Sequence, residues 1–196
     1  MRASERAGAV VILAAGRSTR MKSDRPKVLH DVAGRPMLAY PLEAARALAP
    51  ERLIVVVGPD GGQVREAFAD QAVFVEQPEP RGTGDAVLQA RAALAGFAGE
   101  VMILYGDTPL LRAETLARMR AAKAERGAEL LLLSARLPLP GRVVRDARGR
   151  VARIVETTDA SPEELALEEG NTGVYLVDAD LLWKALAEVD DDNAQG

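Results

Sequence analysis

Basic side chains crowd the segment from Arg17 to Lys27, which follows the apolar stretch Ala9–Ile12 and a run of small residues. The cations of this segment are Arg17, Arg20, Lys22, Arg25 and Lys27. Small residues let a backbone turn tightly and offer N–H groups to phosphate oxygens. Arginine adds paired hydrogen bonds to phosphate. The segment therefore indicates an anion-binding loop, with a solvated basic loop as the alternative.

The spacing within this loop argues against two common nucleotide-binding motifs. No Gly-Lys-Ser/Thr follows at the distance that a Walker A motif requires, and the G-x-G-x-x-G spacing of nicotinamide-binding folds is missing. We therefore expect a phosphate-binding loop of another type.

Asp107 directly follows the apolar run Val101–Tyr105 and one glycine. A carboxylate beside a phosphate-binding loop suits Mg²⁺, because this ion commonly takes one or two carboxylates together with substrate phosphates and water. The alternative is an ordinary turn carboxylate before Pro109. The single histidine, His30, follows two apolar residues, and we interpret it as structural rather than as a catalytic base.

The stretch QPEPRGTGDAV begins at Gln77 and leads into a predicted helix. We expect Thr83 or Asp85 to cap that helix, because these side chains accept hydrogen bonds from the first free N–H groups. From spacing alone, a simple Pro-Gly connector is the favoured interpretation.

The elements that must position these residues alternate along the chain. Several short runs are apolar throughout (IVVV, MILY, LLLL), which is typical of parallel strands covered on both faces. The predicted strands are 9–14, 52–57, 72–76, 101–105 and 129–136, and the predicted helices are 37–48, 61–69, 83–94 and 112–126. Strands that alternate with helices predict an α/β doubly wound fold, with the ligand at the carboxyl ends of the strands.

The pattern changes after Leu137. Short β candidates at 143–145, 151–156 and 172–177 are joined by turn residues and predict a small antiparallel lobe. Residues 178–188 then read as a helix that Asp178 caps.

Composition narrows the possible partners. A length of 196 residues fits one domain, and the net charge of −4 with few aromatic residues argues against a nucleic-acid partner. The chain contains no cysteine, which fits a reducing cytoplasm. The run Ala9–Ala15 is too short to span a bilayer and lacks the layout of a signal peptide, so we expect a cytoplasmic protein without a membrane partner.

The stretch LAAGRSTRMKSDRPKVLHDVAGRPM resembles the L-A-A-G-x-G-T-R-M…P-K signature of sugar-nucleotide pyrophosphorylases. In its longer form it is similar to bacterial N-acetylglucosamine-1-phosphate uridyltransferases. EQPEPRGTGDAV, YGDTPLL, IVETTDA, EGNTGVY and NAQG match later motifs of that family in the same order. The chain departs from the pattern at Ser18, where the family usually has Gly, and at Pro140, where it usually has Tyr.

The resemblance implies a Rossmann-like nucleotide-diphospho-sugar transferase fold and a defined reaction. Uridylyl passes from UTP to N-acetyl-α-D-glucosamine 1-phosphate, giving UDP-N-acetylglucosamine and pyrophosphate for cell-wall precursor synthesis. Residues 1–136 would be mainly nucleotide-binding and 137–196 mainly sugar-binding. The implied catalytic residues are Arg20, Lys27 and Asp107, with Asp107 holding Mg²⁺. The implied substrate-binding residues are Leu13, Ala14, Ala15, Gly16, Lys27, Gln77, Gly82, Thr83, Tyr105, Gly106, Asp107, Gly141, Glu156 and Asn171.

Two other functions stay open. One is a sugar-1-phosphate nucleotidylyltransferase that uses dTTP or another hexose, and the other is a catalytically silent nucleotide-sugar-binding module. The resemblance also implies relatives that continue beyond Gly196 with a second Mg²⁺ ligand and a trimeric acetyltransferase domain. We therefore expect the present chain to fold, to turn over poorly and to have a disordered tail at 190–196. A monomeric state is compatible with this chain, whereas the full-length relatives are expected to form trimers.

Overall fold

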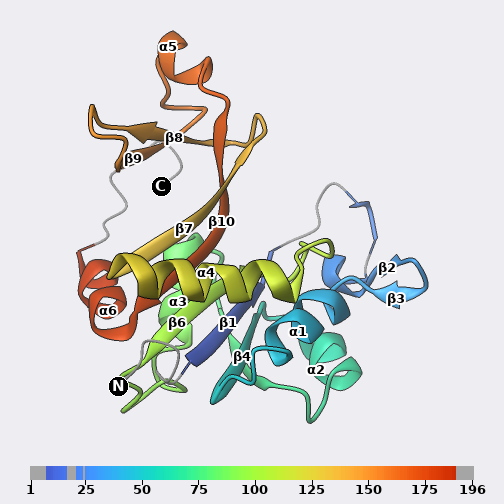
Figure 1. Cartoon of the computed structure of the whole chain (residues 1–196). Helices are drawn as coiled ribbons and strands as arrows, with labels where there is room; N and C mark the ends of the chain where they lie inside the picture. The colour runs from blue at the N-terminus through green and yellow to red at the C-terminus, as the bar shows by residue number, and fades with distance from the viewer. Residues whose placement is uncertain (1–7, 17–20, 24, 189–196) are drawn as a thin grey trace. The chain divides into compact units, whose positions relative to one another are not determined.

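The computed structural model describes residues 8–16, 21–23 and 25–188 (Figure 1). The predictions for Arg20 and for the tail at 190–196 lie outside these residues. The contacts divide the chain into two compact units. Among the described residues, the first unit comprises those up to 131 together with 176–188, and the second comprises 132–175.

Apolar, β-branched runs form a parallel sheet in the first unit. Strand β1 (Gly8–Ala14) pairs with β4 (Arg52–Val57) on one side and with β6 (Glu100–Tyr105) on the other, and β5 (Val73–Glu76) pairs with β4. Residues 10–12 and 54–57 are almost fully buried. The four predicted strands of this sheet are confirmed with bounds that differ by at most one residue.

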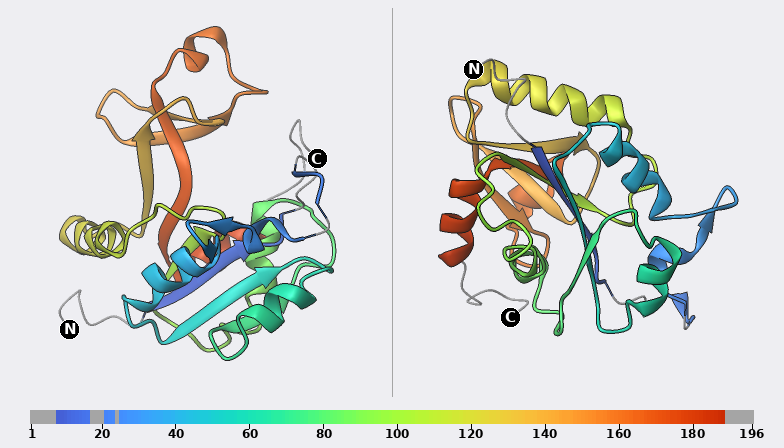
Figure 2. Two further views of the ribbon diagram at one scale, coloured as in Figure 1. Left: turned by 90° about the vertical axis from the view of Figure 1, so that its right-hand side faces the viewer. Right: turned by 90° about the horizontal axis from the view of Figure 1, so that it is seen from below.

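Helices cover both faces of this sheet, as the apolar strands predicted. Helices α1 (Ala39–Arg46) and α4 (Ala113–Arg126) lie together on one face, while α3 (Thr83–Gln89) and α6 (Ala179–Ala187) lie on the other (Figure 2, right). Helix α2 (Gly62–Ala67) follows β4. This arrangement confirms the Rossmann-like α/β fold class.

Helix α3 is shorter than the predicted range 83–94. After Gln89 the chain continues in tighter turns, in which Arg91 N–H donates to Leu88 C=O and Phe97 N–H donates to Leu94 C=O. Such i→i+3 bonds close ten-atom rings and end regular α-helix geometry while keeping the apolar face inward. Leu94 and Phe97 remain buried, so the apolar period was correct although the element type was not.

A buried ionic cluster explains why the cap predicted for α6 is wrong. Asp178 occupies the N-cap position but its side chain makes no capping bond. Its Oδ1 instead accepts a hydrogen bond from Lys123 Nζ at 2.5 Å, and the same ammonium contacts Glu100 Oε1 at 3.1 Å. Lys123 and Glu100 are 2% and 4% exposed, so charge pairing in the interior outweighs a helix cap at this position.

The second unit holds the antiparallel strands that the sequence predicted. Strand β8 (Gly141–Arg145) pairs antiparallel with β9 (Val151–Glu156), and β10 (Glu169–Asp178) pairs antiparallel with β8. Strand β7 (Leu130–Arg136) pairs with β10. The short helix α5 (Pro162–Leu165) was not predicted, although Ser161 and Glu164 form the reciprocal capping box that marks a helix start.

The segment between β1 and α1 carries no long element but is well anchored. Lys27–Leu29 forms one 3₁₀ turn, and Asp31–Val32 (β2) pairs with Arg35–Pro36 (β3). Val28 and Leu29 are buried, and Leu38 N–H donates to Val28 C=O at 2.9 Å. Within the described ranges, none of the helices combines the length and apolar character needed to cross a membrane.

Candidate functional site

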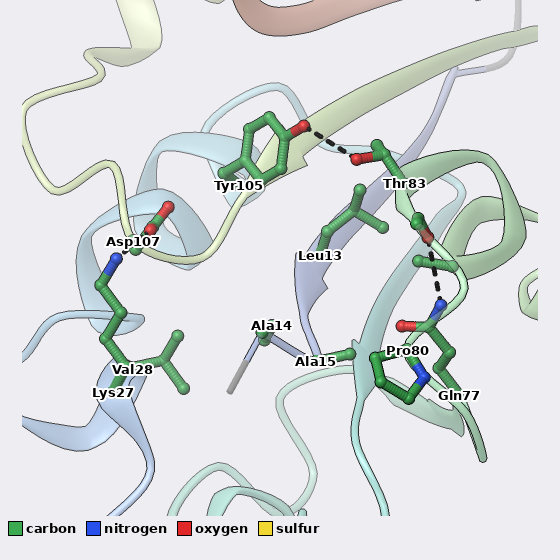
Figure 3. Close-up of a pocket in the computed structure, with 13 residues that line it drawn as sticks. Leu13, Ala14, Ala15, Lys27, Val28, Gln77, Pro80, Thr83, Tyr105 and Asp107 are labelled. Carbon is green, nitrogen blue, oxygen red and sulfur yellow. Dashed lines mark hydrogen bonds and ion pairs between the residues drawn. The ribbon is translucent and has the colours of Figure 1, made fainter. Parts of the chain in front are cut away.

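A pocket of about 310 Å³ opens in the first unit at the carboxyl ends of β1 and β6 (Figure 3). Its walls come from the end of β1, the 3₁₀ turn at Lys27, the β5–α3 connection and the end of β6. The lining residues are Leu13, Ala14, Ala15, Gly16, Lys27, Val28, Gln77, Pro80, Gly82, Thr83, Ala86, Tyr105 and Asp107. Parallel strands end at one edge of a sheet, which brings these distant segments together.

Most of the predicted site residues of this unit therefore meet in one cavity. Gly106 is not part of the lining but lies directly behind it, where its N–H donates to Leu13 C=O at 2.8 Å. A Cβ at position 106 would lie 3.2 Å from atoms of Ala14, Leu38 and Val28. A side chain at position 106 would therefore push these neighbours outward by a few tenths of an ångström.

The backbone of Ala14–Gly16 borders a second cavity of about 470 Å³, which Arg25, residues 58–61, Gln63 and Val64 also line. Gly58 packs tightly against the loop, because a Cβ on it would lie 3.3 Å from Ala15 O. The small residues of the loop thus leave space on both of its sides, as an approach to a bulky anion requires.

A cation and a carboxylate meet at one wall of the pocket. Lys27 Nζ lies 2.5 Å from Asp107 Oδ2, and the two side chains are 40% and 35% exposed (Figure 3). The ammonium carries three donors. Asp107 takes one of them, and the described residues provide no other acceptor for it. Lys27 therefore keeps donors for an anionic ligand.

The same wall offers a single carboxylate, Asp107, to a metal ion. The described part of the chain contains no group of three or more His, Cys, Asp or Glu side chains that could hold a metal ion. Asp107 Oδ1, however, has no hydrogen-bond partner among the described residues. One carboxylate fits an ion that is held mainly by substrate phosphates and water, and does not fit a preformed protein cage.

Gln77 lies on another wall of the pocket and is only 5% exposed. Its Nε2 donates to Gly82 C=O at 3.1 Å and to Asp85 Oδ2 at 2.7 Å. Thr83 Oγ1 and Tyr105 OH lie 3.3 Å apart on the neighbouring wall. Amide, hydroxyl and backbone groups thus line the pocket beside apolar residues such as Leu13 and Val28.

The helix cap predicted at Thr83 or Asp85 is wrong. The N-cap of α3 is Gly82, with φ +100° and no side-chain capping bond. Only glycine adopts this backbone conformation without strain. The Asp85 carboxylate is occupied by Gln77 and, at 3.2 Å, by Gln89 Nε2.

In the second unit, the three residues predicted to contact the sugar lie together. Gly141 pairs with Glu156 across β8 and β9. A Cβ on Gly141 would lie 3.2 Å from Glu156 Oε1 and 3.3 Å from Asn171 Cβ. Asn171 donates from Nδ2 to Tyr175 OH at 2.6 Å and accepts at Oδ1 from Gly173 N–H at 3.0 Å. These bonds fix the orientation of its amide.

Several pocket residues were not predicted. Val28, Pro80 and Ala86 line the cavity beside the predicted groups. Helical spacing could have identified Ala86, because it lies three positions after Thr83 and shares its face of α3. Val28 and Pro80 lie in irregular segments, which have no period to follow. His30, interpreted as structural, does not line the pocket, and its Nε2 is buried without a hydrogen-bond partner in the described part of the chain.

Comparison with known proteins agrees with the pocket. Residues 10–160 match the MobA-like NTP transferase domain. The "Bifunctional protein GlmU" of Geobacter metallireducens is 50% identical over 193 residues, covering 96% of this chain and 40% of that protein. Those of Pelobacter propionicus and Anaeromyxobacter sp. (strain K) are each 49% identical over 95% of this chain, and the aligned part is 42% and 40% of their length. The chain spans about two fifths of the length of these curated relatives.

The match to the family covers both the loop after β1 and the strands that carry the pocket. Nucleotidyltransferases of this kind typically use a divalent metal ion, which agrees with a carboxylate at the pocket wall. With its parallel sheet, its loop of small residues at the end of β1 and its pocket at the carboxyl ends of the strands, the chain belongs to the MobA-like NTP transferase domain family.

Proposed function

We propose that this chain transfers the uridylyl group of UTP to N-acetylglucosamine 1-phosphate, producing UDP-N-acetylglucosamine and pyrophosphate. The observation that carries the proposal is one pocket with an amide group, Gln77, on one wall and the Lys27–Asp107 pair on another. The resemblance of five ordered motifs and the name of the similar bifunctional proteins support the substrates.

The base would be read by Gln77 and the backbone at Gly82. A carboxamide and a peptide group together match the donor and acceptor edge of uracil. Cytosine reverses that edge and would leave buried polar groups unpaired, which is a strong basis for rejection.

The chemical step needs no general base. The sugar phosphate is already anionic near neutral pH, so its oxygen attacks the α-phosphorus of UTP while pyrophosphate leaves with the electrons of the broken P–O bond. The obstacle is repulsion between two polyanions and the charge on the leaving group. Lys27 and the N–H groups of Ala14–Gly16 would bind those phosphates and hold the reactants in line. Arg20 is assigned to the same role and lies outside the described residues.

Asp107 would hold Mg²⁺ through Oδ1. When bound, this ion would neutralise phosphate charge and favour departure of pyrophosphate. The resemblance supports Mg²⁺ as the divalent ion.

The second unit would bind the acetylated sugar. Glu156 and Asn171 offer hydrogen-bonding groups that suit sugar hydroxyls and an acetamide, and Gly141 leaves their surroundings free of a side chain. We also propose that the product serves as a cell-wall precursor and that the reaction takes place in the cytoplasm, where UTP is available.

A nucleotidyl-transfer assay tests the proposal. The chain is incubated with Mg²⁺, either UTP or dTTP, and the 1-phosphates of N-acetylglucosamine, glucose and N-acetylgalactosamine, and nucleotide sugar and pyrophosphate are quantified. We expect the UTP and N-acetylglucosamine 1-phosphate pair to react fastest. Preference for dTTP or glucose 1-phosphate would reassign the substrates, and binding of UDP-N-acetylglucosamine without any turnover would indicate the silent binding module.

A further inference from the structure

The orientation of the Gln77 amide is set by Gly82, which lines the pocket, and by Asp85, which does not. Its Nε2 faces two oxygens, Gly82 O at 3.1 Å and Asp85 Oδ2 at 2.7 Å. A backbone carbonyl and a carboxylate accept hydrogen bonds and cannot donate them. Turning the amide by half a rotation would place Oε1 against both oxygens. The amide nitrogen must therefore face them.

The fixed nitrogen leaves the amide oxygen for the ligand. Gln77 Oε1 has no hydrogen-bond partner among the described residues, and in Figure 3 it points away from the bond to Gly82. Because Gln77 is 5% exposed, an unpaired acceptor there is costly unless a ligand or water donates to it. The pocket thus presents an acceptor, and not a donor, at this position.

We propose that Asp85 is a positioning residue that sets the choice of nucleobase by holding Gln77 Oε1 toward the ligand. The inference rests on the proposed use of UTP. The N3–H group of uracil can donate to Oε1, whereas N3 of cytosine is an acceptor and would be repelled by it. If the amide were free to turn, Nε2 could donate to cytosine N3 and part of this rejection would disappear.

Helix α3 supports the carboxylate in this role. Asp85 lies in its first turn, and Gln89, one turn later, donates from Nε2 to Asp85 Oδ1 at 3.2 Å. The two oxygens of Asp85 are thus shared between Gln89 and Gln77. The carboxylate has little freedom to turn away from the pocket wall.

Asp85→Asn is the informative variant. Asparagine keeps the size of the side chain but offers a donor as well as an acceptor, so the shorter of the two restraints on the Gln77 amide is lost and only the Gly82 carbonyl still favours the parent orientation. The dissociation constants of UTP and CTP are measured with Mg²⁺ present, together with uridylyl and cytidylyl transfer to N-acetylglucosamine 1-phosphate. We expect the UTP-over-CTP preference to fall by about tenfold, through weaker UTP binding and stronger CTP binding.

The ratio of UTP to CTP use distinguishes a positioning role of Asp85 from a general loss of folded protein. Misfolded protein reduces the active fraction for both nucleotides equally and leaves the ratio unchanged. Glu79→Gln is the matched control, because it also neutralises a carboxylate near the start of α3, and Glu79 pairs on the surface with Arg81 at 2.6 Å rather than with Gln77. It should keep the parent ratio.

The possible outcomes are distinct. A parent chain that shows no preference for UTP over CTP would overturn the proposed function and this inference with it. A parent chain that prefers UTP, with Asp85→Asn retaining the same ratio, would overturn the role of Asp85 alone.

Discussion

Lys27 reaches the pocket because its neighbours are anchored in the core. Val28 and Leu29 are each 5% exposed, so the 3₁₀ turn cannot rotate without exposing them. A lysine on such a fixed backbone is preorganised for charge that develops during a reaction, and this is the arrangement that contributes most to catalysis.

Removal of this ammonium gives the first prediction. Lys27→Ala should lower the rate of uridylyl transfer by roughly 10²–10³, the effect of losing one preorganised donor to developing charge. Turnover at saturating substrate is the measurement. Lys184→Ala, which removes an exposed lysine from α6, is the control and should react at the parent rate. Near-normal turnover of Lys27→Ala would support the alternative interpretation, in which the loop is a solvated basic surface.

The second prediction concerns Asp107 as a metal ligand. Asp107→Asn removes the charge that attracts the ion and should raise the Mg²⁺ concentration needed for half-maximal activity by roughly tenfold or more. A Mg²⁺ titration of transfer activity measures this shift. The Mg²⁺ titration curves of the two variants should differ, because Lys27→Ala lowers the maximal activity while Asp107→Asn shifts the Mg²⁺ concentration at half-maximal activity. A midpoint unchanged in Asp107→Asn would contradict the assignment.

Single residues also show where local sequence was insufficient. Asp178 and Asp85 were both expected to cap helices, since each lies at or near a helix start. Each instead bonds a side chain outside its own helix, Lys123 in the case of Asp178 and Gln77 in the case of Asp85. A cap is a local feature and can be predicted locally, whereas a competing tertiary partner becomes visible only after folding.

At the scale of elements, α4 is joined to β6 by charge as well as by apolar packing. Leu116, Met119 and Lys123 form its buried stripe, and the lysine lies opposite Glu100 in β6. Arg120 Nε lies 3.6 Å from the other oxygen of Glu100. Burying this carboxylate is tolerable only because cations surround it.

The third prediction follows from that burial. Lys123→Met should destabilise the chain by about 3 kcal/mol in urea unfolding, because it leaves buried Glu100 without its closest cation. Adding Glu100→Gln to this variant should recover part of the loss, since the buried charge is then gone. A loss below about 1 kcal/mol for the single variant would show that water or Arg120 satisfies the carboxylate.

Strands β7, β8 and β10 of the second unit meet at one carboxylate. Glu169 in β10 accepts hydrogen bonds from Ser134 in β7 at 2.6 Å and from Arg145 in β8 at 2.7 Å and 2.6 Å. The hydrogen bonds from Arg145 and Ser134 lower the pKa of Glu169 from 4.5 to about 2, against a smaller opposing effect of burial.

The fourth prediction is the pH dependence of this contact. Because the pKa is lower in the folded state, the stabilisation is fully present above pH 4.5 and is lost as the pH falls toward 2. Glu169→Gln should therefore cost about 1 kcal/mol at pH 7, a modest value because the pair is partly exposed to water, and the difference from the parent should shrink below pH 4.5. Urea unfolding at several pH values measures it. Glu163→Gln, an exposed neutralisation on α5, should show no such trend, and a constant deficit in Glu169→Gln would rule out the titration.

Elements were more predictable than their ends. The runs IVVV in β4 and MILY in β6 contain enough β-branched and apolar residues to identify buried strands without any partner. The C-terminal end of α3 could not be predicted, because the apolar period continues through the 3₁₀ turns that follow it.

At the scale of the whole molecule, the site was predictable because topology brings it together. Leu13, Gln77 and Asp107 are distant in sequence, yet each follows or ends a parallel strand of one sheet. A fold class therefore predicts which segments meet, while the side chains that complete the wall, such as Pro80 and Val28, depend on irregular backbone that no period describes.

Because the pocket draws on segments from β1 to β6, a ligand bound there should stabilise the first unit as a whole. UTP with Mg²⁺ at about one hundred times its dissociation constant should contribute about 2.7 kcal/mol. For a chain of this length, that corresponds to a rise in Tm of roughly 5–11 °C. Thermal unfolding measures the shift, and amide hydrogen exchange should show added protection at residues 13–16, 77–86 and 105–107. Pyrophosphate and CTP at the same concentration are the controls, because the first supplies only the phosphate charge and the second adds a base with the reversed edge. An equal rise with pyrophosphate would mean that the pocket binds an anion without reading a base, and the uridine specificity would have to be abandoned.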